Sequence, residues 1–189
     1  MSKKYWYRFR VDSIRLPSWD YGSDAAYFVT ICTKDRKHYF GQITCSMESE
    51  AEMHLTPIGQ LAHDYWQEIP KQFPFAKLNA FVIMPDHMHG IIIINRDTDA
   101  INRVSTINRV STGGGITGAK NPMLSQNLSR IIRWYKGRTT YESRKIDPDF
   151  AWQSRFYEHI IREDRAFQNI ATYIYNNPKK WALDKGIST

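Results

Sequence analysis

Apolar and polar residues follow two different periods along this chain, and each change of period marks a boundary between elements. Four runs rich in β-branched and aromatic residues predict strands at 26–33, 77–84, 87–94 and 152–161. Three segments with apolar residues three or four positions apart predict helices at 56–69, 122–138 and 163–177. In these predictions Pro70 ends the first helix and Pro178 ends the last.

The order of these elements is strand, helix, strand, strand, helix, strand, helix. Pro85 and Asp86 predict a tight turn that joins the second and third strands as a hairpin. A βαββαβ order predicts an α+β, ferredoxin-like antiparallel sheet with helices on one face, followed here by a C-terminal helix. With 189 residues, we expect the chain to form a single domain, 1–189.

Two segments lie outside this pattern. Residues 1–24 are basic and aromatic with turn residues, and we expect an irregular N-terminal arm. Residues 96–121 lose apolar periodicity and contain three successive glycines and a tandem copy of the hexapeptide INRVST. Two copies are too few for a repeat architecture. We therefore expect a flexible insertion loop.

Composition and charge narrow the class of partner. The chain carries 26 lysines and arginines against 19 acidic residues, a net charge of +7, and 14% of its residues are aromatic. This balance favours nucleic acid, with basic groups on phosphates and aromatic rings on bases, although a generically basic protein would look similar. Two cysteines, no signal-peptide pattern and no long apolar run predict a cytoplasmic protein without a membrane partner.

His87 and His89 open the third predicted strand. Because side chains two positions apart in a strand share a face, the two imidazoles form a partial metal site. Such a pair also arises by chance. A structural zinc site would need a closed set of four ligands, and Cys32 and Cys45 do not have that spacing.

The last predicted helix carries the second candidate group. Phe167, Ile170 and Ile174 recur at helical spacing and should face the sheet, which leaves Tyr173 and Asn177 one turn apart on an adjoining face. Tyr173 is a candidate nucleophile and Asn177 a candidate ligand. The structural alternatives are a half-buried core aromatic and a helix C-terminal residue before proline.

Tyrosine chemistry on DNA explains the combination of these residues. Attack of a tyrosine on a phosphodiester adds charge to the phosphoryl oxygens, which a divalent cation can neutralise. The phosphotyrosyl ester formed is comparable in energy to the bond broken, so no nucleotide cofactor is needed. Imidazole suits zinc, whereas amide and phosphate oxygens suit magnesium or manganese, and the residues alone leave the metal open.

Four strings occur in order along the chain: YFVTI at 27–31, VIMPDHMHG at 82–90, WQSRFYEHIIR at 152–162 and YIYNNP at 173–178. They resemble the single-tyrosine HUH transposases, most closely the REP-associated tyrosine transposases, in which HUH denotes histidine, hydrophobic residue, histidine. The resemblance covers about residues 15 to 183.

The resemblance implies an enzyme that cleaves single-stranded DNA and transfers strands at hairpin-associated sites, with Mg²⁺ or Mn²⁺ as its cofactor. It implies that His87, His89 and Asn177 bind the metal and that Tyr173 becomes linked to a 5′ phosphate. Guided by it, we predict DNA contacts in the N-terminal arm and at six basic residues: Arg130, Arg133, Lys136, Arg155, Lys179 and Lys180.

Three alternatives stay open. A domesticated hairpin-binding module without turnover would share the fold. Relatives act either as homodimers that exchange their tyrosine helices or as single subunits, and the sequence does not distinguish these states. His159 lies on the fourth predicted strand and could face either side of the sheet, so it is not included among the metal ligands.

Overall fold

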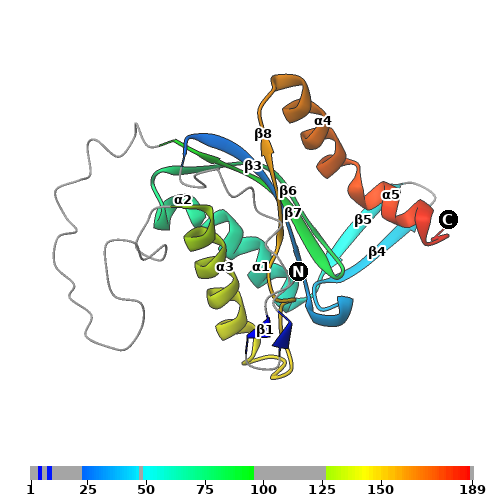
Figure 1. Cartoon of the computed structure of the whole chain (residues 1–189). Coiled ribbons are helices and arrows are strands. Elements are labelled where there is room, and N and C mark those ends of the chain that lie inside the picture. Colours follow the sequence, from blue (N-terminus) through cyan, green and yellow to red (C-terminus); the bar gives the residue numbers. More distant parts are fainter. Residues whose placement is uncertain (1–3, 6–7, 10–22, 47–48, 96–126, 188–189) are drawn as a thin grey trace.

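A four-stranded antiparallel sheet forms the centre of the computed structural model, which describes residues 4–5, 8–9, 23–46, 49–95 and 127–187. Its strands are β3 (Ala25–Cys32), β6 (Ala76–Met84), β7 (His87–Ile94) and β8 (Tyr157–Ile161), in the spatial order β6-β7-β3-β8 (Figure 1). Each neighbouring pair runs antiparallel. The predicted ferredoxin-like α+β arrangement is confirmed, with β8 at one edge of the sheet.

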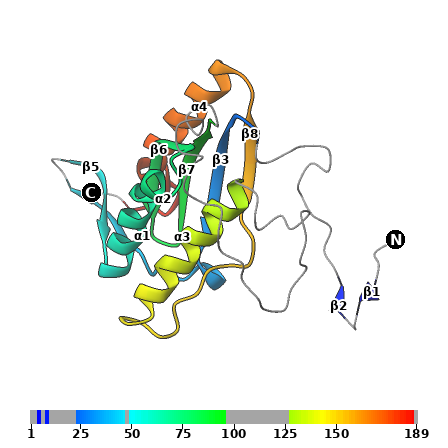
Figure 2. The same cartoon turned by 90° about the vertical axis from the view of Figure 1, so that its left-hand side faces the viewer.

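Helices cover both faces of this sheet. α1 (Pro57–Gln67), α2 (Ile69–Gln72) and α3 (Leu128–Ser143) lie on one side, and α4 (Asp164–Tyr175) and α5 (Asn177–Asp184) lie on the other (Figure 1). In Figure 2, α3 crosses in front of the sheet. The side-chain oxygen of Thr56 accepts from Gly59 N at the start of α1, and that of Asn127 accepts from Arg130 N at the start of α3.

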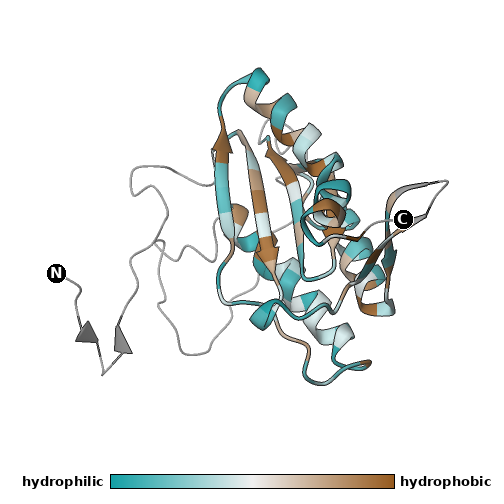
Figure 3. Ribbon diagram, turned by 90° about the vertical axis from the view of Figure 1, so that its right-hand side faces the viewer, coloured by the Kyte–Doolittle hydropathy of each residue, from teal (hydrophilic) through white to brown (hydrophobic). Residues whose placement is uncertain are grey.

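The alternation of β7 divides the interior into two layers. Met88 and Ile92 join the main core with α1 and α3, whereas Ile91 joins a smaller cluster with Ile174 of α4. Figure 3 shows the apolar residues concentrated along the strands. Gly90 allows the main layer to pack closely, because a Cβ there would lie 2.3 Å from Cζ2 of the buried Trp66.

The hydrophobic pattern did not predict a second, two-stranded sheet, formed by β4 (Gly41–Ser46) and β5 (Ser49–Leu55). It packs beside α5 through a cluster that includes Ile43, Met84 and Ala182. A 3₁₀ turn, η1 (Lys34–Arg36), leads out of β3. Within the predicted irregular arm, β1 (Lys4–Tyr5) pairs with β2 (Arg8–Phe9), so the arm is not wholly irregular.

Two prolines begin helices, where the sequence pattern predicted that they would end them. Pro70 lies in the first turn of α2 and Pro178 in the first turn of α5. A proline is tolerated there because the first N–H groups of a helix have no intrahelical acceptor. The predicted helix 163–177 is therefore divided at Asn176, which ends α4 and precedes α5.

The fourth strand is shorter than predicted. Trp152 makes only an isolated bridge to Thr33, and β8 begins at Tyr157. Arg155 has a φ of 74°, which a strand does not permit, and Lys136 Nζ donates to the carbonyl oxygens of Gln153 and Arg155. These carbonyls accept from an ammonium group, so residues 153–156 form a loop.

The predicted insertion loop 96–121, with its tandem repeat, and Leu124 lie outside the described residues, as does most of the arm. Within the described part of the chain, the helices are too short or too polar to cross a bilayer.

Candidate active site

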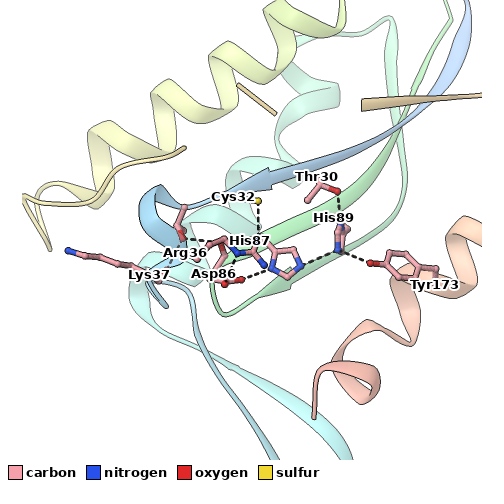
Figure 4. Close-up of polar contacts among 9 residues, drawn as sticks. Thr30, Cys32, Arg36, Lys37, Asp86, His87, His89 and Tyr173 are labelled. Carbon is pink, nitrogen blue, oxygen red and sulfur yellow. Dashed lines mark hydrogen bonds and ion pairs between the residues drawn. The ribbon is translucent and has the colours of Figure 1, made fainter. Parts of the chain in front are cut away.

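The two histidines lie at the start of β7, directly after the turn that joins it to β6. Both are buried, with 5% of His87 and 6% of His89 exposed. Their Nε2 atoms face each other at 3.1 Å (Figure 4). The prediction that strand alternation places both rings on one face is therefore confirmed, and that face is the one covered by α4 and α5.

Each ring has a partner on its other nitrogen. His87 Nδ1 lies 2.6 Å from Asp86 Oδ1, and His89 Nδ1 lies 2.8 Å from Thr30 Oγ1 on the neighbouring strand β3. Arg36 Nε reaches the second oxygen of Asp86 at 2.9 Å. Partners on the far nitrogens fix the ring orientations and leave both Nε2 atoms directed into a common space.

Burial sets the charge state of the site. Burial of the ring, and next the nearby charge of His87, lower the pKa of His89 from 6.5 to about 3. Burial acts to raise the pKa of Asp86, but the hydrogen bond and charge of His87, together with Arg36, outweigh it and hold that pKa below its ordinary value. The site thus contains an ionised carboxylate and, at His89, a neutral imidazole, which is the form that binds metals.

Tyr173 comes to this site from α4. Its hydroxyl oxygen lies 3.4 Å from His89 Nε2, and the two ring centroids are 5.3 Å apart. Phe28 of β3 stacks on the His89 ring at 5.4 Å and meets the Tyr173 ring edge-on at 6.2 Å. Tyr173 therefore packs against these two rings while 41% of the residue stays exposed.

Asn177 is buried at the first position of α5. It precedes Trp181 by four residues, so the two share a face of the helix. Trp181 packs against the His87 ring with centroids 5.7 Å apart. The face of α5 that carries Asn177 is therefore directed towards the histidine pair, as the proposed role of a third ligand requires.

The side chains present fit a divalent metal ion. Two ring nitrogens converge, each backed by a hydrogen-bond partner, and an amide lies on the helix face nearest to them. Among the residues that the structure describes, no three His, Cys, Asp or Glu side chains gather closely enough to bind a metal. The amide oxygen of Asn177 is the candidate third ligand, and an amide oxygen favours hard ions over zinc.

The predicted DNA-contacting residues lie in different places. Arg130, Arg133 and Lys136 are on α3, across the sheet from the histidines. The guanidinium of Arg130 lies over the Phe73 ring at 5.9 Å, Arg133 is exposed, and Lys136 Nζ is bound to the loop carbonyls described above. Burial lowers the pKa of Lys136.

The other three predicted contacts are exposed. Arg155 lies in the loop before β8, and Lys179 and Lys180 lie in the first turns of α5, on the helix that carries Asn177. Only these two lysines share an element with the candidate site. The DNA-contacting role of all six residues stays a prediction.

A large groove runs between α3 and the segment that contains β8, with a volume of about 1690 Å³. Its lining includes six cationic side chains, which are Arg133, Lys136, Arg144, Lys145, Arg155 and Arg162, against the acidic Glu158 and Glu163. Tyr157 and His159 also line it. They pair with Thr30 and Phe28 in the sheet register, so they lie on the face that carries His89. The groove therefore extends around the β8 edge towards the candidate site.

Sequence reasoning missed several residues of the site. Asp86 had a signal, since a carboxylate beside a metal-ligating histidine commonly orients it, but it was interpreted only as a turn residue. Phe28 and Thr30 lie within the string YFVTI, but no role at the site was predicted for them. Arg36 and Trp181 lie outside the four strings and are brought to the site by the fold.

Comparisons with known proteins agree with this architecture, although no family model matches the chain. It is 36% identical over 174 residues to an uncharacterized protein of Haemophilus influenzae, covering 92% of this chain and 91% of that protein. Two relatives are described with the words REP-associated tyrosine transposase. One, from Haemophilus influenzae, is 27% identical and covers 85% of this chain and 74% of its own length. The other, from Escherichia coli, is 26% identical and covers 77% and 69%.

Among solved structures, the chain is similar to one described as a REP-associated tyrosine transposase bound to a REP hairpin. The TM-score is 0.53 with 20% identity, and the match covers 94% of this chain and 76% of that one. This likeness supports the fold described above.

Proposed function

Because the chain belongs to the family of REP-associated tyrosine transposases, we propose that it cleaves and rejoins single-stranded DNA at hairpin-associated sites. Tyr173 is the nucleophile of this proposal. His87, His89 and Asn177 hold a divalent ion, Mg²⁺ or Mn²⁺.

One observation carries this proposal: the hydroxyl of Tyr173, a partly exposed residue of α4, lies 3.4 Å from Nε2 of His89 in the buried histidine pair on β7. Tyr173 and His89 are separated by 84 positions in sequence. A core aromatic would need no such hydroxyl contact, and a histidine pair that served only packing would not direct both Nε2 atoms to one side. The arrangement supports a nucleophile beside a metal site.

The reaction exchanges one ester for another. The Tyr173 oxygen forms a bond to phosphorus, the bond from phosphorus to the 3′ oxygen breaks, and that oxygen leaves as a hydroxyl after it takes up a proton. The tyrosine proton is released to solvent, so atoms and charge balance without a nucleotide cofactor. A divalent ion at the histidines would supply positive charge for the phosphoryl oxygens. The phosphotyrosine can then be attacked by a second 3′ hydroxyl, which rejoins the strand.

The surface around the β8 edge supports a path for the DNA. A folded stem would bind in the groove between α3 and β8, where basic side chains outnumber acidic ones. A single strand leaving that groove would pass Tyr157, which is 52% exposed and lies edge-on to Phe28 with centroids 6.3 Å apart. An exposed ring at that point can stack on a base. Beyond it lie Tyr173 and the histidine pair.

The test is an assay for a covalent protein–DNA adduct. Single-stranded hairpin DNA from the region flanking the gene is incubated with the protein, with EDTA or with Mg²⁺ or Mn²⁺, and the products are resolved on denaturing gels and mapped by mass spectrometry. We expect a metal-dependent adduct at Tyr173 that is lost in Tyr173→Phe and His87→Ala. Tyr175→Phe is the matched control, because Tyr175 is on the same helix but is 81% exposed.

An adduct that maps to another tyrosine, or that persists in Tyr173→Phe, would exclude the proposed nucleophile. Tight hairpin binding with no adduct under any metal condition would instead indicate a domesticated DNA-binding module. Sedimentation of the complex distinguishes a homodimer from a single subunit, the two states that the sequence left open.

A further inference from the structure

Both oxygens of the Asp86 carboxylate are engaged by donors. Oδ2 accepts from Arg36 Nε at 2.9 Å, and Oδ1 lies 2.6 Å from His87 Nδ1 (Figure 4). Asp86 is 4% exposed, whereas the Arg36 side chain is 49% exposed. A buried carboxylate with one cation and one imidazole has a defined orientation, because each oxygen has its own donor.

The turn that delivers Arg36 has an unusual backbone. Asp35 and Arg36 both have a φ of 55°, in the left-handed region that costs free energy for residues other than glycine. Thr33 anchors the turn, since its hydroxyl contacts the carbonyl oxygens of Lys37 and Asp86. Backbone strain of this kind persists only where the surrounding structure holds it in place. Here it brings the guanidinium to Asp86.

The carboxylate determines which nitrogen of His87 carries the proton. An ionised carboxylate only accepts hydrogen bonds, so His87 Nδ1 must donate, and Nε2 is left with a lone pair directed towards His89. His89 is held differently, because its Nδ1 faces the Thr30 hydroxyl, which either donates or accepts. One imidazole is therefore fixed in the ligand form, and the other can adapt.

We propose that Arg36 and Asp86 are positioning residues that fix His87 as the Nδ1-protonated tautomer and so keep its Nε2 available to a metal ion. The role of this arrangement in metal binding rests on the proposed function, but the tautomer itself is a property of the metal-free chain. Arg36 acts through Asp86 by holding Oδ2.

The variant Asp86→Asn gives the sharpest test. Arg36 can only donate, so the amide oxygen of the new side chain turns to Arg36 and its NH₂ group turns to His87 Nδ1. His87 Nδ1 must then accept, and the proton moves to Nε2, which removes the lone pair from the metal side. Loss of activity through a wrong histidine tautomer is the known consequence of such a substitution in the serine protease triad.

Long-range ¹H–¹⁵N NMR of the metal-free protein reports the tautomer directly. We expect His87 protonated at Nδ1 in the wild type and at Nε2 in Asp86→Asn. In the double variant Asp86→Asn with Arg36→Gln, the side chain at 36 can accept as well as donate, so the Nδ1-protonated form should be restored in part. Lys37→Gln is the matched control, because it removes a neighbouring exposed cation without touching Asp86.

Binding of Mn²⁺, followed by the loss of its free electron paramagnetic resonance signal, is the second readout. We expect Asp86→Asn to raise the Kd for Mn²⁺ by 10- to 100-fold, about the range seen when outer-shell partners of metal ligands are removed. Partial recovery is expected in the double variant, and Lys37→Gln should leave the Kd unchanged. A purely structural role for Asp86 would not give recovery on removal of a second contact.

The proposal is overturned if His87 keeps its Nδ1 proton in Asp86→Asn, or if the wild type has the proton on Nε2. If Asp86→Asn does not give a dispersed spectrum, the single variant Arg36→Gln decides the role of Arg36. If that variant changes neither the Kd for Mn²⁺ nor the tautomer of His87, Arg36 is removed from the proposal. If the wild type binds no Mn²⁺ at all, the proposed function fails, and the NMR result alone decides the tautomer.

Discussion

Burial of His89 should make the stability of the protein depend on pH in a specific direction. In the unfolded chain His89 has its ordinary pKa of 6.5, and in the folded chain the value is about 3. Between these values the unfolded state binds more protons, so the free energy of unfolding falls as the pH falls. This contribution is fully present above pH 6.5 and is lost as the pH falls towards 3.

The size of the effect follows from the two values. A pKa shift of one unit corresponds to 1.36 kcal/mol, so the full shift of His89 contributes about 5 kcal/mol to the free energy of unfolding. About 2 kcal/mol of this contribution is lost by pH 5. Urea unfolding of metal-free protein at pH 8 and pH 5 measures the loss, and His89→Gln removes the titrating group. We expect the wild type to lose about 2 kcal/mol more than His89→Gln over this range.

Two results would refute the reasoning. The first is an equal loss of stability in the wild type and in His89→Gln. The second comes from NMR: if the His89 ring resonances move with a midpoint near pH 6.5 in the folded protein, the ring is not held neutral by burial, and the explanation of its pKa is wrong.

Three further predictions test packing and the basic groove. Gly90→Ala should lower the unfolding free energy by about 1–3 kcal/mol in urea melts, because the new methyl group overlaps Trp66. Gly137→Ala in α3 should raise it by about 0.5–1 kcal/mol, since a Cβ there meets nothing within 4 Å. In DNA-binding titrations against salt, Arg133→Met should lower the salt slope by about 1. Lys136→Met should lower it less, because the Lys136 ammonium is already bound to loop carbonyls.

The sequence pattern predicted the central sheet well, because its strands are long and their interiors are buried. His87–Ile94 was recognisable from its run of β-branched residues, and β3 and β6 differ from the predictions by one residue. The sequence pattern failed at β4 and β5. These strands form a small two-stranded sheet with too few apolar positions to show a period of two. The pattern also failed at Pro178, whose local effect fits both the end of one helix and the start of the next.

The candidate site was predictable only where chemistry and local periodicity coincide. The histidine pair is fixed by strand alternation, so a local rule could find it. Helical spacing also singled out Tyr173 and Asn177, but it placed them on one helix, whereas Tyr173 lies on α4 and Asn177 begins α5. Arg36 reaches Asp86 across 50 positions of sequence, through a left-handed turn that no residue preference announces. Contacts of that kind are created by the sheet register, and sequence periodicity carries no record of them.

The two faces of the sheet carry different candidate groups, and this separation constrains the path of a DNA strand that binds to both. The basic side of α3 and the histidine pair lie on opposite faces of the sheet. Packed side chains cover the sheet on both faces, so a DNA strand cannot pass through it. A strand bound by both must pass an edge, and among the described residues the β8 edge has a basic groove together with the exposed Tyr157 on the face that carries His89. Tyr157→Ala should therefore weaken binding of hairpins that carry a single-stranded extension, by about 1–3 kcal/mol for one lost stacking contact. Blunt hairpins should bind as before, and equal weakening of both substrates in fluorescence anisotropy would show that the strand takes another path.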